Sequence, residues 1–183
     1  HPNIVALYDY EEDDDGLYLI MEYVSGMELG KHINTVSGPI PNDEAKQIMG
    51  QMLDGLEYAH GQGIIHRDIK PENIRIVQRD GEDYLVLMDF GLARLLSDDD
   101  HQQLSNPMQF HTQADKSTGS PIYMSPESFT KPQDLDPRCD LYSLGVTMFE
   151  LLTGVPPFSG RTLIQLMGKH VYTSPPTLSE QLP

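Results

Sequence analysis

Residues 138–152 constrain the fold more than any other part of the sequence. Their apolar side chains cover nearly the whole circumference of the helix that the spacing predicts, and Thr153 and Gly154 would end it. A helix of this kind lies inside a protein, so other parts of the chain have to pack around it. Asp140 falls within the same helix, which predicts a buried carboxylate in need of hydrogen-bond partners.

Four short runs of β-type residues predict two hairpins elsewhere in the chain. An acidic turn ending at Gly16 would join the first pair, and Asp80 and Gly81 would form the turn of the second. The predicted strands are 4–10 with 17–23, and 74–77 with 84–88.

The clearest amphipathic helix follows Asn42, which we expect to cap its first turn. Asp43 and Glu44 come next, where the helix dipole favours acidic side chains, and Gly61 and Gly63 would end the helix. Its predicted buried face consists of Ala45, Ile48, Met49, Met52, Leu53 and Leu56.

The remaining segments complete a mixed order of elements. We expect a polar linker with a short helix over 25–38 and one more helix over 162–172. Residues 92–121 are polar and irregular, and a segment of that length without structure is usually functional or disordered. Strands, helices, strands and then helices follow each other along the chain, which favours an α+β fold over a regular βαβ alternation.

Size and charge exclude several classes of function. The 183 residues suffice for one domain with a core, and 38% hydrophobic and 22% charged residues are typical of a soluble globular protein. Acidic residues outnumber basic ones by 28 to 12, for a formal net charge of −16, so the surface should repel nucleic acid and anionic lipid. Two interpretations remain: the acidic loops attract a basic partner or substrate, or they only keep the protein soluble.

Cysteine usage and hydropathy bear on the compartment. Cys139 is the only cysteine, so no disulfide can form within the chain, which fits a reducing compartment. No stretch approaches the roughly 18 apolar residues of a membrane span, and the sequence opens without a signal peptide. We therefore expect no membrane contact from this segment and a cytoplasmic location, with an anchor elsewhere in a parent protein left open.

Four short motifs in a fixed order carry the chemistry. They are His66-Arg67-Asp68-Ile69-Lys70-Pro71-Glu72-Asn73, Asp89-Phe90-Gly91, Ser125-Pro126-Glu127 and Asp140-Leu141-Tyr142-Ser143-Leu144-Gly145. Together they resemble the signature of the eukaryotic-type protein kinases, and the motif sequences are most similar to those of bacterial members of that family. The resemblance covers essentially the whole chain, and Lys70 stands where Ser/Thr kinases have it.

The resemblance implies a fold and its organisation. It implies an α+β, protein-kinase-like fold, consisting of a mainly helical C-lobe with the last strands of the N-lobe and the hinge. Residues 1–24 would be the C-terminal remnant of the N-lobe with the hinge, and residues 25–183 would be the C-lobe, incomplete at its C-terminus.

The same resemblance implies roles for residues around the second predicted hairpin and in the loop before it. Asp68 would accept the proton of a substrate Ser or Thr hydroxyl, and Lys70 would place a positive charge on the phosphoryl group transferred from ATP. Asn73 and Asp89 would supply oxygen ligands to Mg²⁺. Since these two residues flank the second predicted hairpin, the hairpin would bring them together although they lie sixteen residues apart.

The end of the first hairpin resembles the kinase hinge. The Glu22 carbonyl and the Val24 amide would hydrogen-bond the adenine edge, with Met21 as gatekeeper, and Glu28 could reach the ribose hydroxyls. Arg75 departs from the family pattern, which has an apolar residue under the adenine. Its stem could pack there with the guanidinium reaching outward, or it could signal weak nucleotide binding.

Regulation is also implied. Arg67 before the catalytic aspartate resembles kinases whose activation loop is phosphorylated, by an activating kinase or by the protein itself. Thr112, Ser117 and Thr118 are the favoured sites, with solvated loop hydroxyls as the alternative, and Ser120 would bridge Asp68 and Lys70.

Two functions remain open from the sequence. The first is an ATP- and Mg²⁺-dependent Ser/Thr protein kinase domain, and the second is a pseudokinase-type regulatory binding module without phosphoryl transfer. In the family, the glycine-rich loop, a strand lysine and its partner glutamate precede the position of His1. We therefore expect the segment by itself to be weak or inactive. Asp68, Lys70, Asn73 and Asp89 are all present, which favours the enzyme.

Overall fold

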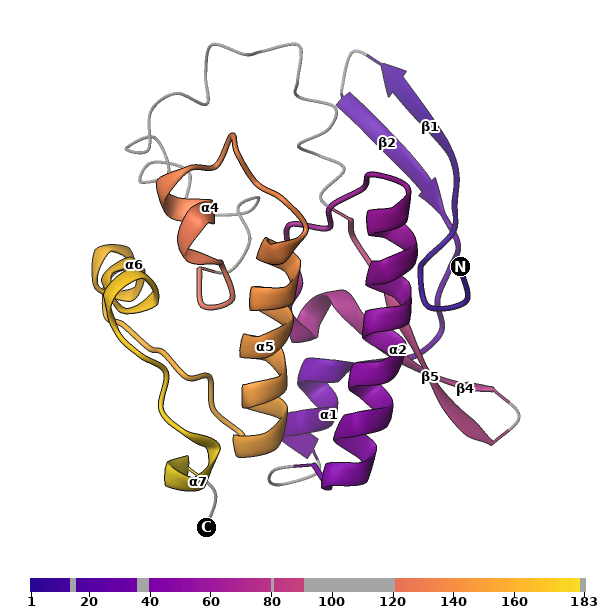
Figure 1. The fold of residues 1–183 in the computed structure, drawn as a ribbon. Coiled ribbons are helices and arrows are strands. Elements are labelled where there is room, and N and C mark those ends of the chain that lie inside the picture. The colour runs from indigo at the N-terminus through magenta and orange to yellow at the C-terminus, as the bar shows by residue number, and fades with distance from the viewer. Residues whose placement is uncertain (14–15, 36–39, 80, 91–120, 182–183) are drawn as a thin grey trace.

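The computed structural model describes residues 1–13, 16–35, 40–79, 81–90 and 121–181 (Figure 1). The strands are β1 (Leu7–Asp13), β2 (Gly16–Met21), β3 (Met27–Glu28), β4 (Ile74–Arg79) and β5 (Glu82–Leu87). The helices are α1 (Leu29–Thr35), α2 (Asn42–Gly61), the 3₁₀ turn η1 (Pro71–Asn73), α4 (Pro126–Thr130), α5 (Arg138–Thr153), α6 (Leu163–Tyr172) and α7 (Leu178–Gln181).

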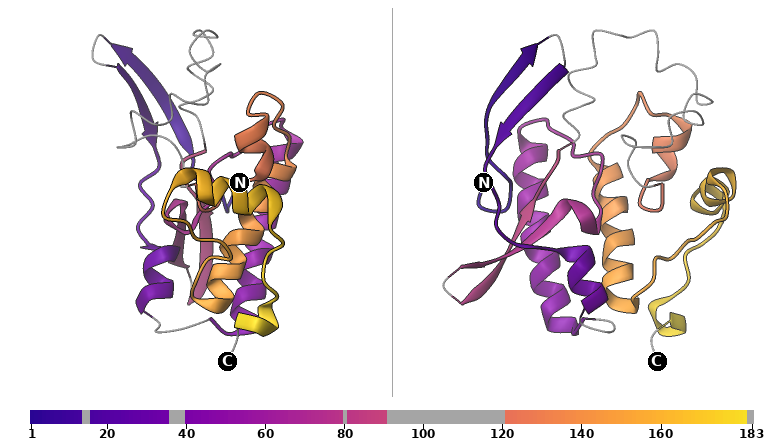
Figure 2. Two further views of the ribbon diagram at one scale, coloured as in Figure 1. Left: turned by 90° about the vertical axis from the view of Figure 1, so that its left-hand side faces the viewer. Right: turned by 180° about the vertical axis from the view of Figure 1, so that it is seen from behind.

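Helix α5 confirms the central helix that the sequence predicts. It runs beside α2, with α4 and α6 on its other side (Figures 1 and 2). Gly154 ends it in the left-handed conformation at φ 77°, which glycine adopts without steric cost. Asp140 is only 1% exposed, as predicted. One part of the surface of α5 stays open, because Leu141 is exposed.

Strands β1 and β2 form the first predicted hairpin, with Asp13 paired to Gly16. The two strands extend away from the helices at one end of the molecule (Figures 1 and 2). The predicted start at residue 4 is wrong, because Ile4 forms a parallel bridge with Leu87 at the end of β5. The Leu87 carbonyl accepts from the Val5 amide at 3.0 Å. The first residues of the chain therefore form hydrogen bonds with the end of β5 and do not belong to the first hairpin.

Strands β4 and β5 confirm the second hairpin and are longer than predicted. Arg79 pairs with Glu82, which leaves a two-residue turn in which Gly81 has φ 84°; Asp80 lies outside the described residues. Strand β3 was not predicted. It adds a third strand to this sheet through the pairs Met27 with Ile76 and Glu28 with Arg75.

Helix α2 differs from the prediction at its start and on one face. Pro41 occupies the capping position and its carbonyl accepts from the Ala45 amide at 2.9 Å, so Asn42 already lies inside the helix and is not the cap. Leu53 is 39% exposed although it was placed on the buried face. It lines an open surface hollow together with Leu141 of α5, whereas Met52 is fully buried.

The core lies where the helices meet the three-stranded sheet. Its buried members come from α1, α2, α5, β4, β5 and the segments between them: Leu29, Ile33, Ile40, Ala45, Ile48, Met52, Leu56, Ile69, Ile74, Leu85, Leu87, Leu144, Met148 and Leu151. Ile69 and Ile74 belong to this core and flank Lys70 and Asn73, so the loop before β4 is anchored on both sides. In the part of the chain that the structure describes, no helix is long and apolar enough to cross a membrane.

Candidate active site

The loop before η1 is held by the buried carboxylate of α5. Asp140 Oδ2 accepts from the His66 amide at 2.8 Å, and its Oδ1 accepts from the Arg67 amide at 2.7 Å. The side chain of His60 donates a further bond of 2.8 Å to Oδ2. These three donors are the partners that a buried carboxylate needs. They hold Arg67 at φ 67°, a conformation that a non-glycine residue seldom adopts without such support.

The imidazole of His66 connects the loop to the end of β5. Its Nε2 donates to the Met88 carbonyl at 2.8 Å, and its Nδ1 accepts from the Asp68 amide at 3.3 Å. The ring also lies against the Phe90 ring, with centroids 4.5 Å apart. Burial lowers the pKa of His66 below its usual value, more than the nearby Asp140 carboxylate raises it. The ring is therefore neutral and fixes the position of Asp68.

Asp68 has one carboxylate oxygen bound by two donors. Its Oδ2 accepts from Lys70 Nζ at 2.7 Å and from Asn73 Nδ2 at 2.8 Å. Asn73 Nδ2 also donates to the Asp68 backbone carbonyl at 2.9 Å, so the side chain and the backbone of Asp68 are held together. The structure therefore brings together three of the residues that the sequence singles out, with Asp68 and Lys70 only partly buried.

Asn73 and Asp89 come together as the predicted hairpin requires. The Met88 amide donates to the Asn73 carbonyl at 2.8 Å, which places Asp89 beside Asn73. Asn73 commits its amide nitrogen to Asp68, so its amide oxygen stays available. Asp89 is exposed, has φ 50°, and its carboxylate takes no hydrogen bond or ion pair from the described residues. A side-chain amide and a carboxylate at neighbouring backbone positions are the ligand types that a hard cation such as Mg²⁺ prefers.

The predicted hinge follows β2. Met21 ends that strand opposite Leu7, and the Glu22 amide donates to the Ala6 carbonyl at 2.8 Å. Among the described residues, the Glu22 carbonyl and the Val24 amide have no hydrogen-bond partner in the protein. These two backbone groups are the ones that the sequence assigns to the base edge.

Glu28 and Arg75 form a pair that the sequence analysis missed. Arg75 NH2 lies 3.6 Å from Glu28 Oε1, and Arg75 NH1 donates to the Gly26 carbonyl at 3.2 Å. Lys31 Nζ donates to the same Oε1 at 3.0 Å, and this bond is the main reason that the pKa of Glu28 is lowered. The Arg75 side chain is partly buried, as one of the two interpretations expected, but its guanidinium is bound to the segment after the predicted hinge.

Tyr123 and Glu150 form a second pair that was missed. Tyr123 lies shortly after position 120 and donates its hydroxyl to Glu150 Oε2 at 2.6 Å. Burial raises the pKa of both groups, and the hydrogen bond from Tyr123 opposes this for Glu150. Only the unusual position of a carboxylate late in the apolar helix α5 could have indicated this pair.

The predicted phosphorylation sites and Ser120 lie outside the described residues, so Thr112, Ser117 and Thr118 stay predictions.

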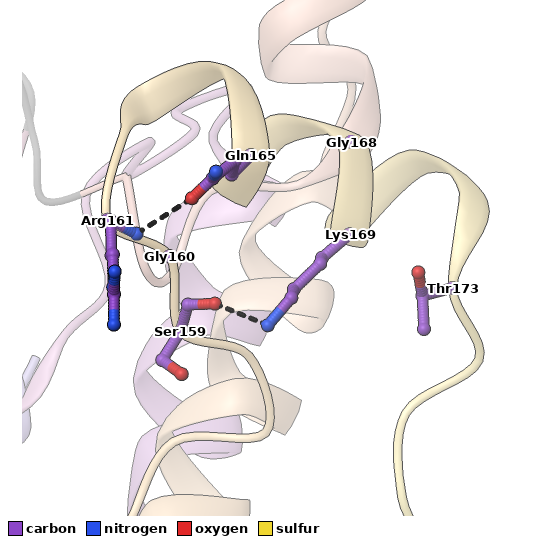
Figure 3. A pocket seen from close by; sticks show the side chains of 7 residues that line it. All are labelled: Ser159, Gly160, Arg161, Gln165, Gly168, Lys169 and Thr173. Carbon is purple, nitrogen blue, oxygen red and sulfur yellow. Dashed lines mark hydrogen bonds between the residues drawn. The ribbon is translucent and has the colours of Figure 1, made fainter.

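An open groove near α6 contains none of the predicted site residues (Figure 3). In it, Lys169 Nζ donates to the Ser159 carbonyl at 2.6 Å, and Gln165 Oε1 accepts from the Arg161 amide at 3.1 Å. The groove is lined by Ser159, Gly160, Arg161, Gln165, Gly168, Lys169 and Thr173.

Comparison with known proteins identifies the class. The family model of the protein kinase domain matches residues 1–178, and the chain therefore belongs to the protein kinase domain family. Among curated relatives, the serine/threonine-protein kinase PrkC of Bacillus subtilis is 40% identical over 97% of this chain. The serine/threonine-protein kinase pkn3 of Myxococcus xanthus is 37% identical over the whole chain.

The relatives are longer than this chain. It covers 25% of PrkC and 32% of pkn3, so it spans about a quarter to a third of their length. The names of these relatives support a Ser/Thr kinase domain, and they give no support to the regulatory-module alternative.

Solved structures confirm the protein-kinase-like α+β fold. The kinase domain of Mycobacterium tuberculosis PknI, crystallised as a point mutant, superposes with a TM-score of 0.70 at 28% identity, over 99% of this chain and 57% of that one. Rad53 residues 1–466 in complex with AMP-PNP gives a TM-score of 0.68 at 33% identity, over 91% of this chain and 38% of that one.

Proposed function

We propose that the protein containing this chain is a serine/threonine protein kinase that transfers the γ-phosphoryl group of ATP to Ser or Thr hydroxyls of a protein substrate. The observation that carries the proposal is that Lys70 and Asn73 both donate hydrogen bonds to Asp68 Oδ2. The β4–β5 hairpin brings the backbone of Asp89 beside Asn73. Phosphoryl transfer depends on positioning and on neutralising charge, and this arrangement supplies both.

Each residue takes one part of the reaction. Asp68 orients the substrate hydroxyl and accepts its proton as the hydroxyl oxygen bonds to the γ-phosphorus and ADP leaves. Lys70, already beside Asp68, turns its charge toward the phosphoryl oxygens. Asn73 and Asp89 would hold Mg²⁺, which neutralises phosphate charge when bound.

The hinge residues and the two lobes belong to the same proposal. The Glu22 carbonyl and the Val24 amide hydrogen-bond the adenine edge beside Met21, and the carboxylate of Glu28 accepts from the ribose. Residues 1–24 are then the end of the N-lobe with the hinge, and residues 25–183 form the C-lobe. A substrate with Ser or Thr acceptors, an activating kinase or self-phosphorylation, and a cytoplasmic location complete the proposal.

Phosphate transfer from labelled ATP to a basic generic protein tests the proposal. The natural full-length chain is compared with its Asp68→Asn variant in the presence of Mg²⁺, and the labelled residue is identified. Label on Ser or Thr that falls by about 10²–10⁴-fold in the variant supports the kinase, because that range is typical of a lost general base. No label with either protein, although both are folded, favours the regulatory module, whereas equal label with both contradicts the role of Asp68 as the base.

A further inference from the structure

Arg75 links the segment after the predicted hinge to the sheet. Its NH1 donates to the Gly26 carbonyl at 3.2 Å, and its NH2 lies 3.6 Å from Glu28 Oε1. The Arg75 side chain is 32% exposed and the Glu28 side chain 25%, so both charges are partly screened from solvent. One guanidinium therefore contacts both a backbone carbonyl and a carboxylate of the segment that leads from β2 into α1.

The backbone explains why this contact is possible. Glu28 and Arg75 are directly opposite each other in the β3–β4 pair, where cross-strand side chains are close neighbours. A Cβ atom on Gly26 would clash with the Ile76 carbonyl, so a residue without a side chain is needed for this approach. The short strand β3 is thus held against β4 at both Gly26 and Glu28.

The consequence for Glu28 is an asymmetric carboxylate. Lys31 Nζ donates to Oε1 at 3.0 Å, and Arg75 faces the same oxygen. Within the described residues, Glu28 Oε2 has no hydrogen-bond donor. Two cations on one oxygen fix the orientation of the carboxylate and leave the other oxygen able to accept from a ligand. The lowered pKa of Glu28 is consistent with an ionised acceptor.

We propose that Arg75 is a positioning residue that orients Glu28 to accept hydrogen bonds from the ribose hydroxyls of the bound nucleotide. The inference rests on the proposed kinase function, and it goes beyond that function by giving a role to a residue that departs from the family pattern. It also decides between the two interpretations of Arg75: the guanidinium supports nucleotide binding instead of weakening it.

Discrimination between ATP and 2′,3′-dideoxy-ATP tests this role. Dissociation constants of both nucleotides are measured by calorimetry with Mg²⁺ on the natural full-length chain and on Arg75→Leu, Glu28→Gln and the double variant. The matched control is Arg79→Leu, since Arg79 lies on the same face of β4 but contacts the Tyr84 ring, 5.6 Å away, instead of Glu28.

The expected result is a loss of discrimination. The unchanged protein and Arg79→Leu should prefer ATP by about 10-fold, and Arg75→Leu should reduce this ratio to roughly 2–3-fold, as expected for a weakened hydrogen bond to a charged group. The ratio in the double variant should equal that of Glu28→Gln, because Arg75 acts through Glu28.

Three results would overturn the inference. If Arg75→Leu weakens both nucleotides by the same factor, Arg75 only supports the local fold. If Arg75→Leu binds ATP more tightly, the guanidinium competes with the ribose. If the unchanged protein binds no ATP, the proposed function fails and this inference fails with it, whereas the first two results leave the proposed function intact.

Discussion

The Asp140 carboxylate and the Arg67 backbone amide are joined by a hydrogen bond of 2.7 Å, between residues 73 positions apart. Arg67 has φ 67°, and the residue on its N-terminal side donates to the other oxygen of the same carboxylate. The side chain from the central helix therefore holds a strained turn directly before Asp68. A buried polar group thus determines the geometry of the candidate catalytic loop.

Replacing this carboxylate should destabilise the protein and the loop together. Asp140→Asn leaves one oxygen to accept where two did, and turns an amide nitrogen toward a backbone N–H group. We expect a loss of about 2–4 kcal/mol in the free energy of unfolding, measured by urea denaturation. Asp136→Asn is the matched control, because the Asp136 side chain is 45% exposed and, among the described residues, its carboxylate accepts from Arg138; it should shift the urea midpoint much less, as expected for a surface ion pair. Equal losses in both variants would contradict the special role of Asp140.

Removing the side-chain amide of Asn73 should affect both the metal requirement and the turnover. Asn73→Ala deletes a predicted Mg²⁺ ligand and the donor that holds Asp68 Oδ2. The Mg²⁺ concentration for half-maximal activity should rise by about 10–100-fold, the range typical of a perturbed metal site, and kcat should fall. Activity is measured over a series of Mg²⁺ concentrations. Gln78→Ala, on the exposed part of β4, is the control, and a similar shift in that variant would argue against a metal role for Asn73.

His66 should make stability depend on pH in the acid range. Its folded pKa lies below the ordinary value of 6.5, so the folded protein binds fewer protons than the unfolded chain below that pH. The stabilisation is therefore fully present above about pH 6.5 and is lost as the pH falls through the lowered folded value. His66→Phe should be less stable at every pH, but its free energy of unfolding should fall less between about pH 7.5 and 5.5. Identical slopes in the two proteins would show that another group carries the dependence.

The Tyr123 hydroxyl should stabilise the half-buried carboxylate of Glu150. Tyr123→Phe removes the bond of 2.6 Å and leaves Glu150 without that donor, which should cost about 1–3 kcal/mol in the free energy of unfolding. Tyr172→Phe is the control, since Tyr172 is 87% exposed. Thermal unfolding at neutral pH compares the two variants. A Tyr123→Phe protein as stable as the control would mean that water replaces the phenol.

Sequence patterns predicted the parts of the molecule that depend on local periodicity or on strong motifs. The apolar circumference of α5, the second hairpin, and the proximity of Asp68, Lys70 and Asn73 all follow from such patterns. The pair of Glu28 and Arg75 does not, because it depends on the register of a two-residue strand that has no periodicity of its own. The predicted N-cap of α2 was wrong, because Pro41 occupies the capping position although Asn42 is the residue type favoured there.

The bonds from Asp140 also limit when the site can be assembled. They bridge 74 and 73 positions of the chain, and the bond between His66 and Met88 bridges 22. During synthesis at about 5–20 residues per second, the loop at residues 66–68 leaves the ribosome several seconds before the acceptor that holds it exists. Until then no hydrogen bond compensates the backbone strain of this turn. The entropy cost of closing so long a segment of chain also still has to be offset by contacts. The candidate active site is therefore a late product of folding, completed only once the central helix has been made.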